Sequence, residues 1–260
     1  MFDSISIWLV FLMSLAMIVI SVEIGYHVGI IRARKSERER EAPIDAVVGS
    51  TLGLLAFMLA FTFGMATSRY DARKQLVVDE ANAIRTADLR AQLVPEPQRS
   101  AIRALLREYV DVRLQGVLHP SELAQAIRRS EQIQAILWSH LTSMEQVQAP
   151  ERVALAAAFV EIINLHTKRV TAVTSNRIYG AIWVALYSVA MLAMGILGYR
   201  AGLSGRRSTI AILALALSFS AVLTLINDLD RPQQGLVGVS QQTLIDLQSK
   251  LRAPTSDEAK

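Results

Sequence analysis

The stretch that decides the fold runs from Ala46 to Ser68 and reads AVVGSTLGLLAFMLAFTFGMATS. It contains no Asp, Glu, Lys or Arg, and its length is close to the roughly 20 residues with which a helix crosses the hydrocarbon core of a bilayer. Because that core offers backbone groups no water, such a stretch is expected to be helical. The sequence therefore predicts a transmembrane span here.

Three further stretches share this length and this lack of charge: Ser4–Val22, Ile178–Tyr199 and Ser208–Asn227. A signal peptide usually begins with Lys or Arg, but the residues before the first stretch include Asp3 and neither basic residue. We therefore interpret this stretch as an uncleaved span. The whole chain is 52% hydrophobic, which is too apolar for an ordinary soluble domain. The sequence predicts an all-α protein with four transmembrane helices, embedded in a lipid bilayer.

Composition also narrows the function. The chain has no Cys, which excludes disulfides, thiolate catalysis and Cys-based metal sites. Its net charge is only +4, and basic loops of membrane proteins account for that without a nucleic-acid partner. The four His residues are scattered, and no phosphate loop, dinucleotide fingerprint or nucleophile elbow occurs. We therefore expect no enzyme activity, no metal site, no cofactor and no nucleic-acid binding.

The charges next to the spans predict an orientation. Two short loops are basic, one over residues 32–43 and one with Arg200, Arg206 and Arg207. The positive-inside rule places both loops in the cytoplasm of a bacterial inner membrane, with both termini and the insertion outside. The expected order is spans one and two in residues 1–68, an extracytoplasmic helical domain in 69–176, spans three and four in 177–231, and an extracytoplasmic tail in 232–260.

The inserted domain is expected to hold about four helices. Prolines at 95, 97, 120 and 150 divide it into segments, since proline removes a backbone donor and restricts the residue before it. No proline occurs between Ile44 and Val94, so the second span is predicted to continue into the domain as one helix. The third span is predicted to continue likewise from the last domain helix. The amphipathic tail either lies on the membrane or, as we prefer, packs on the domain.

Two segments resemble a known family. They are LAFTFGMATSRYDARKQLVVDEANAI (residues 59–84) and LINDLDRPQQGLVGVSQQTL (residues 225–244). Together with the order of spans and insertion, they are similar to the bacterial bestrophin-like domain family of four-span membrane proteins. The family name implies an anion channel. The bestrophins proper keep their large soluble part in the cytoplasm, whereas the charges here place it outside, so no pore residue is carried over from the resemblance.

The second span carries a stripe of small residues three or four apart, with two aromatic residues on a neighbouring face. Small residues allow close packing of helices in lipid, which is one interpretation of the stripe. The other is a pore wall, in which a ring of aromatic side chains closes the path by dewetting. The candidate residues for pore lining or helix packing are Gly53, Phe57, Ala60, Phe61 and Gly64.

The fourth span has a polar stripe formed by Ser220, Thr224 and Asn227, and Asp228, Asp230 and Arg231 follow it. At the end of a helix such charges are either structural or belong to the mouth of a pore. In a cation channel Asp228 or Asp230 would form the acidic ring, and in an anion channel Arg69 or Arg231 would replace it.

Glu23 in the first span is followed one helical turn later by His27. An ionisable residue inside a span is costly and indicates function, such as proton binding or relay. The alternative is an interfacial ion pair between Glu23 and Arg32 or Arg34.

The sequence is compatible with three functions. Four spans are few for a pore in one copy, so the first is an ion channel built as a homo-oligomer around a symmetry axis. The second is a sensor or adaptor that acts through a membrane-protein partner, although the two short basic loops offer no receiver for a signal. The third is a structural envelope protein.

Overall fold

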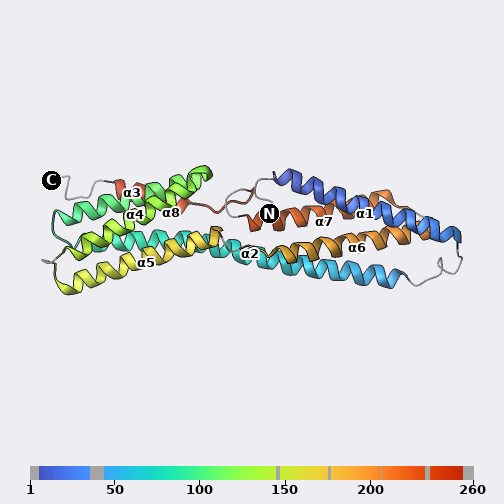
Figure 1. Ribbon diagram of the computed structural model, residues 1–260, viewed down its shortest axis with the longest axis horizontal. Coiled ribbons are helices and arrows are strands. Elements are labelled where there is room, and N and C mark those ends of the chain that lie inside the picture. Colours follow the sequence, from blue (N-terminus) through green and yellow to red (C-terminus); the bar gives the residue numbers. More distant parts are fainter. Residues whose placement is uncertain are drawn as a thin grey trace. The chain divides into compact units, whose positions relative to one another are not determined.

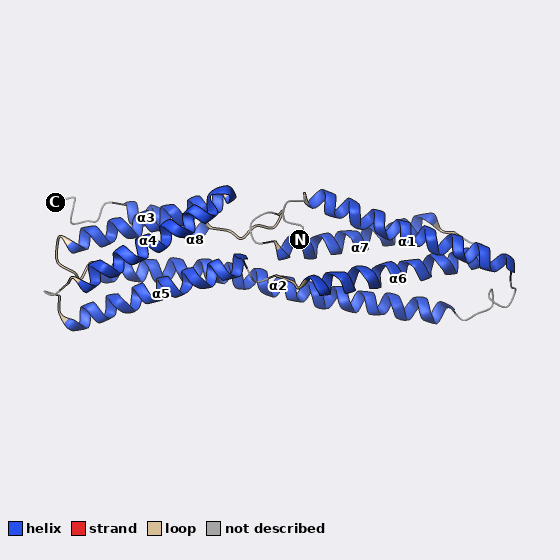
Figure 2. Cartoon of the chain, in the orientation of Figure 1, coloured by secondary structure: helices blue, strands red, loops and turns tan. Residues whose placement is uncertain are grey.

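The computed structural model describes residues 6–35, 44–144, 147–174, 177–205, 207–231 and 235–253. Within these ranges every regular element is a helix (Figure 2). In chain order (Figure 1) the elements are α1 (Ile7–Lys35), α2 (Ile44–Ala91), α3 (Gln98–Leu118), the short 3₁₀-helix η1 (Pro120–Glu122), α4 (Leu123–Thr142), α5 (Ala149–Thr174), α6 (Gly180–Ser204), α7 (Thr209–Asp230) and α8 (Gln242–Arg252). The all-α prediction is confirmed for the described part of the chain.

Four of these helices, α1, α2, α6 and α7, are long and apolar enough to cross a membrane. They cover most of each of the four charge-free stretches of the sequence. The protein is therefore a membrane protein with four apolar helices of spanning length.

Helix α2 is the longest element, with 48 residues in one α-helix. The predicted continuation of the second span is thereby confirmed, and its cause is the absence of proline. The predicted continuation of the third span is wrong, because α5 ends at Thr174 and α6 begins only at Gly180. Between them the N–H of Ile178 binds the Asp230 carboxylate at 3.0 Å, and Tyr179 has the extended dihedral angles φ −58° and ψ 137°.

The chain forms two compact units. Unit 1 comprises Met1–Tyr70 and Arg177–Val237, and unit 2 comprises Asp71–Asn176 and Gly238–Lys260. Helix α2 contributes its first part to unit 1 and its second part to unit 2.

In unit 1, glycines bring α1 and α6 into backbone contact. A Cβ added to Gly25 would overlap the carbonyl oxygen of Gly195, and one added to Gly198 would overlap that of Val22. The same holds one turn further, where Gly202 lies against the carbonyl of Tyr26. We call this contact the glycine seam. It extends between two helices that run side by side in Figure 1, and it is the packing that small residues permit in lipid.

Unit 2 closes around large side chains. Ile84, Ile102, Leu106 and Phe159 from α2, α3 and α5 are fully or almost fully buried in its core. Three leucines of α8 join the same core: Leu244, Leu247 and Leu251. The preferred placement of the amphipathic tail, on the helical domain, is confirmed for α8.

Candidate functional site

The spanning part of α2 has two opposite faces. One is buried in unit 1 by Leu55, Leu59, Thr62 and Ala66. At 3.6 residues per turn, the predicted pore or packing residues fall on the other side of the helix. These residues, all exposed in the single chain, are Gly53, Phe57, Ala60, Phe61 and Gly64. We call them the α2 face.

The glycines of the α2 face make no close contact with another helix among the described residues. A Cβ added to Gly53 or Gly64, or to Gly49 one turn earlier, would meet no atom within 4 Å. Phe57 is 68% exposed and Phe61 is 61% exposed. In contrast to the glycine seam, this small-residue stripe is not used to pack the helices of one copy together.

The polar stripe of α7 turns toward the interior of unit 1. Ser220 is fully buried and donates to the carbonyl of Ala216 at 2.7 Å, and Thr224 donates to the carbonyl of Ser220 at 2.7 Å. The Asn227 side-chain oxygen accepts a hydrogen bond from Nε of Arg231 at 3.1 Å. The two hydroxyls and the Asn227 side-chain oxygen of the stripe are thus engaged within α7 and at its end.

Asp228 holds the chain that follows α7. Its two carboxylate oxygens accept the backbone N–H groups of Leu236 at 3.0 Å and Val237 at 2.9 Å. Gly235 lies so close that a Cβ there would overlap the carboxylate. A buried carboxylate satisfied by two backbone donors is an anchor for the local fold.

Asp230 joins three parts of unit 1 at one end of the spans. Its carboxylate accepts the N–H of Ile178, just before α6, at 3.0 Å. It also forms an ion pair with Arg69 of α2 at 3.7 Å. The Asp-Arg segment after the fourth span therefore links α2, α6 and α7.

Glu23 lies in the second half of α1, before the basic last turn of that helix. Both of its carboxylate oxygens bind Arg207, a residue of the second short loop, and that guanidinium lies 4.9 Å from the ring centre of Tyr26. His27 contacts the backbone carbonyl of Glu23 through Nδ1 at 2.8 Å. The contacts described here join Glu23 and His27 through the Glu23 backbone, not through its carboxylate.

A buried polar cluster in unit 2 was not anticipated from the sequence. At its centre, Glu80 of α2 is fully buried between two arginines. Nε of Arg113 lies 3.1 Å from one carboxylate oxygen, and Arg169 binds the other. Tyr109 donates its hydroxyl hydrogen to Glu80 at 2.9 Å. A possible signal was the i, i+4 spacing of Tyr109 and Arg113 along an otherwise apolar helix face.

Burial and neighbouring charges in the cluster shift the pKa values of Glu80 and His166. Burial alone raises the pKa of Glu80, but the charges of Arg113 and Arg169 outweigh it and hold the pKa below its usual value. Burial, with the positive charge of Arg113, lowers the pKa of His166 to about 4. Nδ1 of His166 lies 3.4 Å from the Tyr109 hydroxyl, while its buried Nε2 has no hydrogen-bond partner among the described residues. Neutral His166 beside ionised Glu80 is the stable arrangement at neutral pH.

Among the described residues, no three His, Asp or Glu side chains gather as they would around a metal ion.

Both a family model and solved structures match this chain. The family model of the Bestrophin-like domain matches residues 11–244. A solved bacterial bestrophin homolog from Klebsiella pneumoniae is similar in fold, with a TM-score of 0.65 and 14% identity, over 96% of this chain and 100% of that chain. A single-residue variant of that homolog gives a TM-score of 0.65 and 14% identity, over 94% and 99%. A crystal structure described only as a membrane protein gives 0.68 and 13%, over 94% and 97%. No curated protein matches the chain.

Proposed function

Because the chain belongs to the bestrophin-like family, we propose that it is a subunit of a homo-oligomeric ion channel. The observation that carries the proposal is the α2 face, which is apolar, rich in glycine and unused by the packing of one copy. A ring of copies around a symmetry axis places the same helix of each copy around one pore. In that arrangement the α2 face lines the axis.

The two phenylalanines supply the gate of this pore. Phe57 and Phe61 are one helical turn apart and largely exposed. Rings of such side chains form a hydrophobic constriction that closes by dewetting. Gly53 and Gly64 on the same face allow neighbouring α2 helices to approach each other closely above and below the constriction.

We propose an anion as the permeant ion. The family name favours it, and no acidic side chain occurs on α2 between Val47 and Ser68. Asp228 and Asp230, the candidates for an acidic ring, accept hydrogen bonds from backbone N–H groups of their own chain. In this proposal the two aspartates stabilise the structure at the ends of the spans, while the α2 face lines the path of the ion.

We further propose that the basic ends of the spans lie in the cytoplasm of a bacterial inner membrane, with unit 2 and both termini outside. The absence of cysteine makes the test direct. In intact cells, Ser139→Cys in unit 2 should react with a membrane-impermeant maleimide, and Lys35→Cys at the end of α1 should react only after the cells are broken. The reverse pattern would place unit 2 in the cytoplasm.

Conductance of the purified protein in planar bilayers tests the channel itself. We expect currents above those of empty bilayers, with a reversal potential that follows the anion gradient. Removing both rings with Phe57→Ala and Phe61→Ala should raise the conductance severalfold, because a wider constriction stays wet. Phe63→Ala is the matched control, since Phe63 is exposed on α2 but lies off the α2 face. Currents no larger than those of empty bilayers over a range of salts would refute the channel.

A further inference from the structure

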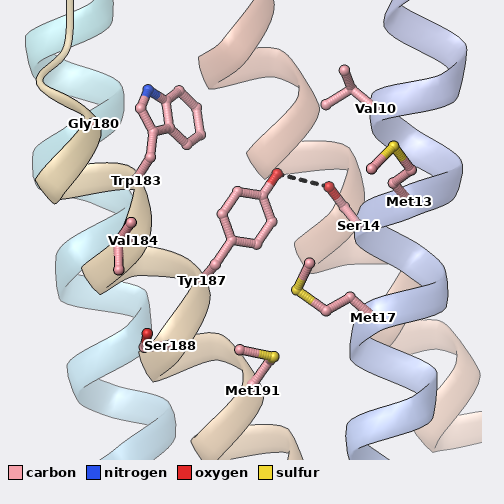
Figure 3. Close-up of a pocket in the computed structure, with 10 residues that line it drawn as sticks. All are labelled: Val10, Met13, Ser14, Met17, Gly180, Trp183, Val184, Tyr187, Ser188 and Met191. Carbon is pink, nitrogen blue, oxygen red and sulfur yellow. Dashed lines mark hydrogen bonds between the residues drawn. The ribbon is translucent and has the colours of Figure 1, made fainter. Parts of the chain in front are cut away.

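Two adjoining hollows follow the glycine seam on the outside of the α1–α6 pair. The first has a volume of about 300 Å³ and lies between Val10–Met17 of α1 and Gly180–Met191 of α6 (Figure 3). The second has about 570 Å³ and lies between Ser21–Val28 and Ser188–Tyr199. Both hollows are lined by Ser188 and Met191, so together they form one groove along the two helices.

The wall of this groove is largely apolar, and several of its hydroxyl groups are bound within the chain. At its first end the hydroxyls of Ser14 and Tyr187 bind each other at 2.9 Å, as the dashed line in Figure 3 marks. In the second hollow Ser21 donates to the backbone carbonyl of Met191. Ser188 and Tyr199 bring further hydroxyl groups to the lining. Most of the other lining residues are apolar, and they include methionines, whose flexible thioethers adapt to irregular apolar shapes. Since both helices are of spanning length and composition, the medium around the groove is hydrocarbon.

One end of the groove is basic. Val28 closes the second hollow, and Arg32 and Lys35 follow it four and seven residues later on α1. These spacings keep all three residues on one face of the helix. Both basic side chains are exposed. The face of α1 that lines the groove thus continues into two positive charges beyond the span.

We propose that the groove binds an acyl chain of an anionic phospholipid, with the lipid phosphate at Arg32 and Lys35. A largely apolar groove that ends in two cations is complementary to a long apolar body with an anionic head. From Val28 to Val10 the groove is about 27 Å long at 1.5 Å per residue. One leaflet is about half of a roughly 30 Å core. The chain of a lipid from the basic side therefore fills the second hollow and ends near Met17 and Met191.

This proposal does not depend on channel activity. It is tested with the full chain in detergent, by native mass spectrometry during titration with phosphatidylglycerol or phosphatidylcholine. We expect tighter binding of phosphatidylglycerol. Arg32→Gln combined with Lys35→Gln should weaken that binding by about 30-fold, because each cation near a lipid surface contributes about fivefold. Arg34→Gln is the matched control, since Arg34 points away from the groove face of α1.

Filling the groove tests the site of the acyl chain. Ser188→Phe places a ring where the two hollows meet and should weaken binding of both lipids. Ala185→Phe adds the same ring at an exposed position of α6 outside the groove and should leave binding unchanged. Equal affinity for the two lipids, or Ser188→Phe protein that binds them like the wild type, would overturn the proposal. Loss of oligomers with Ser188→Phe at unchanged lipid binding would assign the groove to a second copy of the chain.

Discussion

In unit 1, α1 and α6 meet backbone against backbone at Gly25 and Gly198, whereas in unit 2 the helices meet through large side chains and a carboxylate held by two arginines. The difference follows from what drives each contact. Apolar side chains gain little when they leave lipid for another apolar surface, so helices in a membrane associate through close van der Waals packing. Outside lipid, burial of apolar area stabilises the core, and a buried charge must find a partner.

The same comparison distinguishes two glycine stripes within unit 1. The glycine seam is filled by the neighbouring helix, while a Cβ added to Gly53 or Gly64 of the α2 face would meet no atom of the described residues within 4 Å. A glycine repeat therefore indicates that a backbone approaches closely, but not whether the partner lies in the same copy. The predictions below test these differences, beginning with the largest effect.

Removing the charge of Glu80 should destabilise unit 2 most. Glu80→Gln leaves Arg113 and Arg169 buried beside each other without their carboxylate, and breaking a buried pair in this way costs about 3–5 kcal/mol. Thermal unfolding followed by helical circular dichroism measures the loss. The control is Glu108→Gln, which removes a half-exposed partner of Arg129 and should cost less than about 1 kcal/mol. Equal melting of the two variants would contradict a structural role for the cluster.

Adding one methyl group to the glycine seam should be the next largest effect. Gly25→Ala forces α1 away from the Gly195 carbonyl, and overpacking of this kind costs up to about 3 kcal/mol. Gly53→Ala adds the same methyl group to the α2 face, where the single chain has room for it. We expect lower thermal stability only for Gly25→Ala, measured on monomers in detergent. A matching loss for Gly53→Ala would mean that the α2 face is packed within one copy.

The sequence predicts the spans well because a lack of charge over about 20 residues is a local property. It also predicts the unbroken α2, since proline is a local signal. The glycine seam and the Glu80 cluster depend on partners that are distant in the chain. Tyr109 lies 29 residues from Glu80 and Arg169 lies 89 residues away. For the same reason the predicted continuation of the third span from the last domain helix is wrong, because Ile178, just before α6, is held by Asp230. The pore role of the α2 face stays a prediction.

Acid should weaken unit 2 through His166. Its folded pKa of about 4 lies below the ordinary value of 6.5, so the unfolded chain takes up the proton first as the pH falls. The stabilisation is complete above pH 6.5 and is lost progressively down to about pH 4. At 1.36 kcal/mol per pKa unit, the loss at pH 5 is about 2 kcal/mol. Unfolding measured from pH 7 to pH 5 should show this slope in the wild type and in His140→Gln. The slope should be absent in His166→Gln. If it persisted in that variant, a group other than His166 would cause the pH dependence.

The smallest expected effect concerns Asp228 of unit 1. It tests whether this carboxylate stabilises the backbone that follows α7. Asp228→Asn keeps one acceptor oxygen but replaces the other by an NH₂ group, so either Leu236 or Val237 loses the partner of its backbone N–H. A lost hydrogen bond of this kind costs about 1 kcal/mol, which corresponds to roughly fivefold faster amide exchange. Hydrogen exchange of the peptide that contains both amides measures it. Asp246→Asn in α8 serves as the control, because in the described hydrogen bonds the Asp246 carboxylate contacts only the side chain of Gln242. If Asp228→Asn left the amide exchange rate unchanged, the structural role of this carboxylate would be refuted. A role in the ion path would then remain as the explanation of Asp228.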